Sequence, residues 1–160
     1  MEKTSIDNAV ALLNNCNAMS IATSKNNIPW AASVFFVADD SFKLYFISAE
    51  NSRHSQNIID NSSAAATINK DHSDWLHISG LQIEGVVSVS PAKERERILM
   101  LYLNKFPNLS QLRDNPSNEQ DKVILDRLMA SNFYQLKPHR IRLIDNSMGF
   151  GFKTEIKLPE

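Results

Sequence analysis

The sequence predicts a mainly β (α+β) protein, an antiparallel barrel of six to seven strands with helices at its periphery. Strand-like segments mostly follow one another through short polar connections, which favours antiparallel pairing. Helical patterns occur at the start, in the middle and late in the chain. We expect a single domain spanning residues 1–160, because this length suits one core and 42% of the residues are hydrophobic.

The first half of the chain predicts one helix followed by three strands. Apolar residues recur at helical spacing from Ile6 to Cys16, and Thr4 is a candidate cap for that helix. Alternation over residues 18–23 predicts the first strand, and residues 42–48 predict the third. The second strand, residues 28–38, is apolar on both faces. We therefore expect one face to line the barrel and the other to be covered by a helix or a partner subunit.

The second half predicts further strands separated by helices. Gly80 and Gly85 lie inside a long strand, where a bend or a bulge is expected. Ser90, which precedes a proline, predicts the start of one helix, and the pair Ser117 and Gln120 predicts the start of another. The strand-like segments of this half are residues 64–68, 76–90, 133–145 and 152–158.

Composition narrows the class of partner. The formal net charge is -1, and no basic stripe is present, so we expect no nucleic-acid partner. No apolar run reaches the length of a membrane-spanning helix and no signal-peptide pattern is present, so we expect no membrane partner. The single cysteine, Cys16, allows no intrachain disulfide and suits a reducing compartment. We expect a cytoplasmic protein.

Ser48 to His54 is the segment most suggestive of chemistry. It leaves a strand and enters a short helix, whose first backbone N–H groups have no internal partner. Ser52 adds a hydroxyl donor, Arg53 a guanidinium that matches phosphate geometry, and His54 a further donor. These groups predict a phosphate-binding cradle. The alternative interpretation is an ordinary capped helix with solvated basic residues.

A second polar segment, residues 71–77, contains two histidines and two carboxylates. Zinc sites use such ligands, but the spacing matches no strong zinc pattern. A polar loop before a strand is the simpler explanation, and we expect no metal site. The basic run at residues 137–142 alternates with apolar residues and predicts the outer face of a strand.

Four segments together resemble the FMN-binding split β-barrel family, the pyridoxamine 5'-phosphate oxidase-like group. They are residues 29–32, residues 44–48 with 52–54, residues 78–85, and residues 145–151. The last two are most similar to the uncharacterised bacterial YhbP-type branch. The resemblance covers most of the chain and implies a split β-barrel.

The resemblance also implies a cofactor and the residues that bind it. In FMN-binding members, the residues after the third strand hold the flavin phosphate, a role that here falls on Ser52, Arg53 and His54, with Ser48 nearby. Many relatives have lysine at the position of His54. The second strand packs along the isoalloxazine ring, which points to residues 32–34, namely Ala32, Ser33 and Val34. Members of the family pair two barrels, so the resemblance implies a homodimer with the cofactor site at the subunit interface.

One departure bears on the reaction. Pyridoxamine-phosphate oxidases use an arginine on the second strand, where this chain has Ala31-Ala32-Ser33, and their C-terminal substrate signature is missing here. We therefore expect an FMN-dependent oxidoreductase that acts on a different small molecule. Two alternatives remain: a haem-binding split barrel with His54 or His139 as axial ligand, and a cofactor-free dimeric barrel with a binding or regulatory role.

Overall fold

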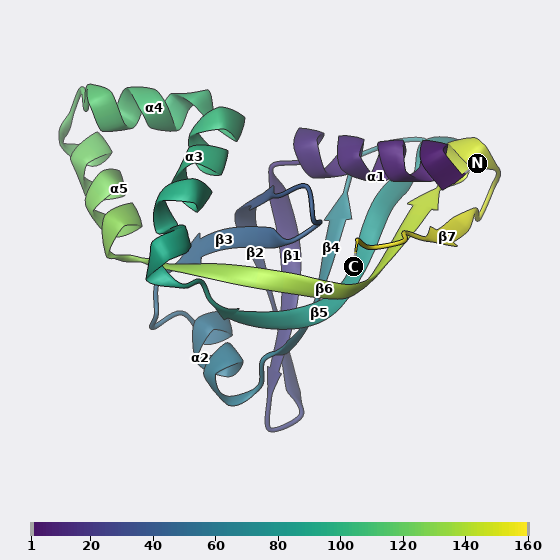
Figure 1. Ribbon diagram of the computed structural model, residues 1–160, viewed down its shortest axis with the longest axis horizontal. Coiled ribbons are helices and arrows are strands. Elements are labelled where there is room, and N and C mark those ends of the chain that lie inside the picture. Colours follow the sequence, from purple (N-terminus) through teal and green to yellow (C-terminus); the bar gives the residue numbers. More distant parts are fainter. Residues whose placement is uncertain (1, 160) are drawn as a thin grey trace.

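The protein is a closed antiparallel barrel of six strands with a seventh strand at one edge (Figure 1). The computed structural model describes residues 2–159. Neighbouring strands pair in the order β3-β2-β1-β4-β5-β6, and β3 also pairs with β6, which closes the barrel. The strands are β1 (Ala18–Lys25), β2 (Ile28–Ala38), β3 (Leu44–Ser48), β4 (Ser63–Asn69), β5 (Ser79–Val89), β6 (Asn132–Asp145) and β7 (Lys153–Glu155). The expected fold class is confirmed.

Five α-helices surround the barrel in the described part of the chain. Helix α1 lies across one end of the barrel, and the consecutive helices α3, α4 and α5 extend to one side as a helical arm (Figure 1). Of the three, α3 packs against β2, whereas α4 and α5 contain no buried residue. The helices are α1 (Glu2–Asn15), α2 (Arg53–Asp60), α3 (Arg95–Lys105), α4 (Pro107–Asp114) and α5 (Glu119–Ala130). None of the described helices is both long and apolar enough to span a membrane.

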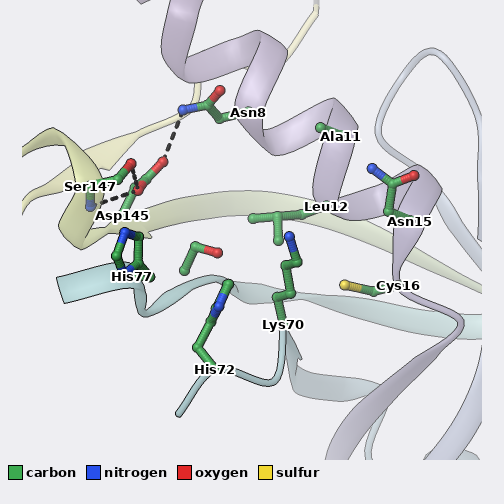
Figure 2. Close-up of a pocket in the computed structure, with 11 residues that line it drawn as sticks. Asn8, Ala11, Leu12, Asn15, Cys16, Lys70, His72, His77, Asp145 and Ser147 are labelled. Carbon is green, nitrogen blue, oxygen red and sulfur yellow. Dashed lines mark hydrogen bonds between the residues drawn. The ribbon is translucent and has the colours of Figure 1, made fainter. Parts of the chain in front are cut away.

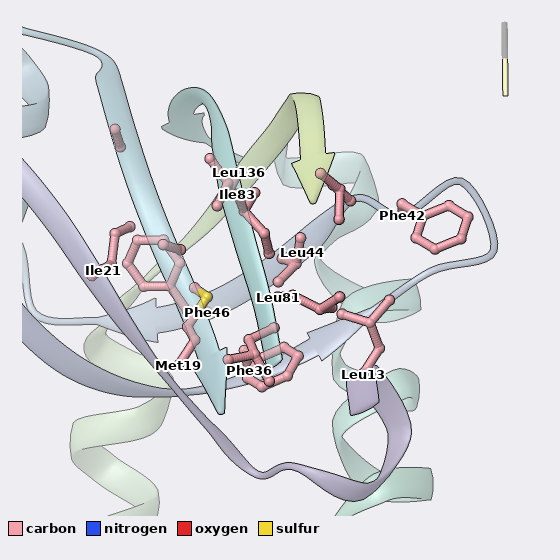
Figure 3. Close-up of a cluster of buried hydrophobic side chains, with 14 of the residues drawn as sticks. Leu13, Met19, Ile21, Phe36, Phe42, Leu44, Phe46, Leu81, Ile83 and Leu136 are labelled. Carbon is pink, nitrogen blue, oxygen red and sulfur yellow. The ribbon is translucent and has the colours of Figure 1, made fainter. Parts of the chain in front are cut away.

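The strand alternation expected from the sequence determines what fills the barrel. Met19, Ile21, Phe36 and Phe46 are at most 1% exposed and belong to one continuous interior cluster (Figure 3). A second, smaller cluster lies outside the barrel beneath α3 and consists of Val37, Tyr45, Ile98, Tyr102 and Phe133. The outer face of β2 is therefore covered by α3 only toward the end of the strand.

Gly85 marks a bulge, as the sequence predicts. The pairing of β5 with β6 shifts register between Glu84 and Gly85. A Cβ at Gly85 would lie 2.4 Å from the backbone oxygen of Lys137, closer than side chains approach backbone atoms. The position requires glycine because the two strands approach closely there.

Three predicted helix starts are wrong in detail. Helix α1 already includes Glu2, so Thr4 lies within it and is not its cap. Ser90 makes no capping hydrogen bond, and its buried Oγ has no partner among the described residues; a 3₁₀ turn at Ala92–Glu94 precedes α3 instead. Helix α5 is capped by Asn118, one residue after the expected Ser117.

Candidate functional site

The predicted cradle forms where β3 ends and α2 begins. Ser52 is the N-cap of α2, with extended backbone angles and an Oγ that accepts from the Ser55 backbone N–H at 3.3 Å. A turn joins the two elements, because the Ser52 N–H donates to the Ala49 carbonyl at 3.1 Å. Pairing of β3 with β6 fixes Ser48 opposite Asn132. The local sequence thus brings the end of the strand and the start of the helix together.

The side chains of Ser48, Ser52 and His54 form one hydrogen-bonded cluster. Nε2 of His54 lies 2.7 Å from Ser48 Oγ and 3.1 Å from Ser52 Oγ, and the two hydroxyls are 3.2 Å apart. Ser52 also donates to Ser55 Oγ at 2.8 Å. The His54 ring is buried beside Phe46, and this burial lowers the pKa of His54 below its ordinary value. The cluster is therefore a compact set of neutral donors.

Arg53 lies next to this cluster but does not join it. Successive helical residues point about 100° apart, so Arg53 faces the surface where His54 faces inward. Its guanidinium carbon lies 4.2 Å from the centroid of the Trp30 ring. This cation–π contact ties the start of α2 to the beginning of β2. Within residues 2–159 no carboxylate neutralises Arg53, so its charge is available to an anion.

The three residues expected along the flavin ring do not share one face of β2. Ala32 and Val34 are half-buried and pack against the barrel interior, whereas Ser33 is exposed on the outer face. This follows from the two-residue repeat of a strand. Phe35, which the sequence prediction did not include, lies on the same outer face as Ser33 and is 65% exposed.

A gap in strand pairing lies beside these residues. The ladder between β2 and β3 stops at the pair Phe36 and Phe46, although β2 begins at Ile28 and β3 continues to Ser48. We call this divergence, between residues 28–35 of β2 and 47–48 of β3, the β2–β3 fork. The edge of β2 that faces away from β1 has no strand partner there among the described residues. Apart from the Phe35 carbonyl, which accepts from Tyr102 Oη at 2.9 Å, and Pro29, which has no N–H, this edge presents backbone N–H and C=O groups to a ligand or a partner.

A groove of about 440 Å³ adjoins the fork on the outer side of the barrel. The outward side chains of Phe35 and Ile47, one from each diverging strand, lie in its wall, and Tyr102 and Phe106 of the α3 region complete the barrel side. Phe35 and Phe106 meet edge to face at 5.6 Å. The helical arm closes the other side with apolar residues and Arg127. The sequence signal for this groove was Phe35 itself: it neighbours Phe36 in an apolar strand, and successive strand residues point to opposite faces, so one of the two aromatic rings must point outward.

Comparison with known proteins places this geometry in a family. Residues 5–143 match the family model described as pyridoxamine 5'-phosphate oxidase. The chain belongs to this family. The match begins in α1 and runs through β6, so it includes the fork, the cradle and the helical arm.

Sequence relatives within the family fit the YhbP-type branch expected from the motifs. A UPF0306 protein of Klebsiella pneumoniae is 26% identical over 131 residues, which cover 81% of this chain and 78% of the relative. The UPF0306 protein YhbP of Escherichia coli is 24% identical over 125 residues, which cover 78% of this chain and 74% of the relative.

Solved structures share the fold at low sequence identity. Campylobacter jejuni ChuZ has a TM-score of 0.73 at 17% identity, covering 97% of this chain and 60% of that one. A haem-binding protein of Mycobacterium smegmatis scores 0.68 at 15% identity, with coverages of 97% and 57%. An FAD-binding protein of Mesorhizobium loti scores 0.60 at 11% identity, with coverages of 83% and 88%. At these identities the likeness extends to the fold alone.

Proposed function

We propose that the protein binds FMN and acts as an FMN-dependent oxidoreductase on a small molecule. The observation that carries the proposal is the β2–β3 fork: an open strand edge with a donor cluster at one end and an apolar groove beside it. Cofactor sites combine these elements, a mostly apolar surface with a few placed polar groups. When bound, FMN supplies the electron-transfer chemistry, and the protein supplies binding and orientation.

The phosphate end of FMN is assigned to the start of α2. Ser48 offers a hydroxyl, and Ser52 can turn its hydroxyl proton from Ser55 to the phosphate. The first N–H groups of α2 carry the positive end of the helix dipole, and Arg53 adds an unneutralised guanidinium. His54, as a neutral ring, holds the two serine hydroxyls in place and adds no charge. Among these four residues, Arg53 therefore carries the full positive charge.

The ring end of FMN is assigned to β2. The unpaired backbone edge at residues 28–35 offers N–H and C=O groups to the polar rim of the isoalloxazine, with Ser33 on the outer face. Ala32 and Val34 support this edge without facing the ligand, because their packing against the barrel interior sets its position. We expect no oxidation of pyridoxamine phosphate, because residues 31–33 lack the arginine that this reaction uses in the family.

A second copy of the chain is proposed to complete the site. The outer face of β1, β2 and β4 is exposed and carries small side chains, with Ala22 opposite both Ala31 and Ala65, and Phe35 lies on the same face of β2 as Ala31. Small side chains on an exposed face allow two sheets to approach closely. We expect a solution mass of twice the 18.1 kDa of one chain, and Phe35→Glu to shift it toward one chain; a monomeric wild-type protein would refute this arrangement.

Titration of FMN followed by quenching of flavin fluorescence tests the proposal. Loss of a charge-assisted phosphate contact costs about 1.5–3 kcal/mol, so Arg53→Ala should weaken binding roughly 10- to 150-fold. Arg113→Ala is the matched control, because Arg113 is exposed on α4 and bonded to Asp114. No saturable binding to wild-type protein at micromolar concentration contradicts the flavin proposal, and equal affinity of Arg53→Ala contradicts the assigned phosphate position.

Haem is the second candidate, because the Mycobacterium smegmatis neighbour is named as haem-binding. His54 is a poor axial ligand here, since its Nε2 is held by two serine hydroxyls. His139 is exposed and paired with Glu84 at 2.9 Å. A Soret band after haem titration that His139→Ala abolishes would support haem, and a colourless dimer indifferent to both ligands would support the cofactor-free alternative.

We also propose a cytoplasmic location, which the single cysteine suits.

A further inference from the structure

A second cavity lies at the other end of the barrel wall from the fork. It has a volume of about 320 Å³ and is enclosed by α1, the segment after β4, and the end of β6 (Figure 2). Strand β6 separates the two places, since its first residue, Asn132, pairs with Ser48 and its last, Asp145, lines this cavity. Nothing in the proposed flavin site uses these residues. We call this space the α1 cavity.

One wall of the α1 cavity is basic. Figure 2 shows Lys70, His72 and His77 facing the α1 side chains Asn8 and Asn15. Lys70 and His72 have no ion pair within the described part of the chain, and the His72 ring contacts only the His77 ring, at 6.4 Å. Three basic side chains from one short segment therefore line this wall; Asp74 acts electrostatically on both histidines, which leaves Lys70 as the unpaired charge of the wall within residues 2–159.

The acidic group that lines the cavity is already bonded to protein donors. Asp145 is 6% exposed; its Oδ2 accepts from Asn8 Nδ2 at 2.9 Å, and its Oδ1 accepts from the Ser147 N–H at 3.1 Å and hydroxyl at 2.6 Å. These bonds join α1 to the turn after β6. Asp145 thus holds the walls together, and within residues 2–159 it forms no ion pair with Lys70. The other nearby acid, Asp74, is bonded to Nδ1 of His77 at 2.9 Å.

The thiol at the far end of the cavity is uncharged. Burial raises the pKa of Cys16, and its Sγ lies 3.9 Å from the Asn69 carbonyl oxygen. The positive charges of Lys70 and Lys105 both act on this thiol, which places two ammonium groups near this end. The Lys105 ammonium donates to the Leu13 and Cys16 carbonyls and does not line the cavity, so an anion there would meet the positive charge of Lys70, without a competing thiolate.

Two braced loops keep the cavity formed. Asn146 donates to the Trp75 carbonyl at 2.7 Å and accepts from the Gly151 N–H at 3.0 Å, which ties the loop before β5 to the loop after β6. Gly149 and Gly151 have positive φ values of 132° and 78°, a backbone that favours glycine. This bracing gives the sequence motif at residues 145–151 a structural role as the frame of the cavity.

We propose that the α1 cavity is a second binding site, specific for a small anion that carries a carboxylate or a phosphate group. Lys70 and His72 contact the anionic group, the Asn15 side-chain amide and the Asn8 Oδ1 contact the rest of the ligand, and Leu12 forms the apolar floor. An unpaired ammonium group beside imidazole groups in a concave, preformed space provides charge-assisted hydrogen bonds of this kind. The site is independent of the flavin proposal.

Amide chemical shifts of ¹⁵N-labelled protein test this site, with inorganic phosphate and citrate as separate probes at constant ionic strength. We expect residues 70–79 and 145–147 to shift together and saturate with a Kd of roughly 1 mM or below for at least one probe. Lys70→Gln should weaken that binding at least about tenfold. Lys93→Gln is the control, because Lys93 is exposed in the turn before α3 and should leave the Kd unchanged.

The two probes separate the two chemistries. Saturation by phosphate alone assigns a phosphate ligand, and saturation by citrate alone assigns a carboxylate. Linear shifts scattered over surface lysines, or an equal Kd for Lys70→Gln, overturn the proposal. Repeating the titration on Arg53→Ala keeps the two sites apart, since this variant should bind the probe as the wild-type protein does even if FMN does not bind at all.

Discussion

The hydroxyl of Tyr102 provides a sharp test of how the fork is built. Tyr102 is 3% exposed, and its Oη lies 2.9 Å from the Phe35 carbonyl oxygen and 3.1 Å from the Tyr45 carbonyl oxygen. These two carbonyls belong to β2 and β3, close to the point where their ladder stops. Tyr102→Phe removes the only group that bridges them from α3 among the described hydrogen bonds, and leaves the ring packing intact.

The expected cost follows from the two acceptors. A buried acceptor that loses its donor costs about 1–3 kcal/mol. Tyr45 is 1% exposed, so its carbonyl finds no ready replacement, whereas Phe35 is 65% exposed and water can reach its vicinity. We therefore expect Tyr102→Phe to lower the free energy of unfolding by about 2 kcal/mol. For a chain of this length, that corresponds to a fall in Tm of roughly 4–8 °C.

Urea unfolding measured by fluorescence and by circular dichroism provides the assay. Tyr134→Phe is the matched control, because Tyr134 is 2% exposed and stacks on Phe46 at 5.0 Å, but its hydroxyl has no hydrogen bond among residues 2–159. We expect the control to change stability by less than about 0.5 kcal/mol. A loss for Tyr102→Phe no larger than that of the control would refute the bridging role of the hydroxyl.

Two further predictions concern the bulge and the cradle. Gly85→Ala places a Cβ 2.4 Å from the Lys137 backbone oxygen, so we expect a loss of about 1–3 kcal/mol in urea unfolding; an unchanged midpoint would contradict the close approach of the strands. Burial lowers the pKa of His54, so the unfolded chain binds the proton more tightly, and stability should fall as pH drops through the ordinary value of 6.5. The variant His54→Gln should flatten that part of the stability profile, and an identical slope in both proteins would refute it.

Strand identity and facing were predictable because they depend on local alternation. Residues 28–38 form β2 as expected, and Met19, Ile21 and Phe46 face inward on the strands for which alternation was predicted. Helix starts were less predictable, because capping depends on backbone angles that neighbouring residues offer almost equally well. Asn118 caps α5 where Ser117 was expected. The sequence analysis did not predict α4 at all, because none of its side chains is buried and the helix therefore has no buried apolar face to recognise.

The candidate site was predictable only where it is local. Ser48, Ser52 and His54 come together because the last residue of β3, Ser48, and the N-cap of α2, Ser52, are four residues apart. The fork was not predictable, because it depends on where two strands stop pairing, and the sequence of either strand alone does not contain this information. The groove likewise needs the helical arm, which reaches Phe35 across more than 60 residues of sequence.

Hydrogen–deuterium exchange of residues 28–35, with and without FMN, tests the central claim most directly. If the flavin ring lies along the open edge of β2, the amides that face away from β1 should exchange more slowly when FMN is bound, and the segment at residues 52–55 should be protected with them. Residues 70–79, at the α1 cavity, should be unaffected. Tight FMN binding that leaves residues 28–35 unprotected, or that protects residues 70–79 instead, would contradict the assigned site.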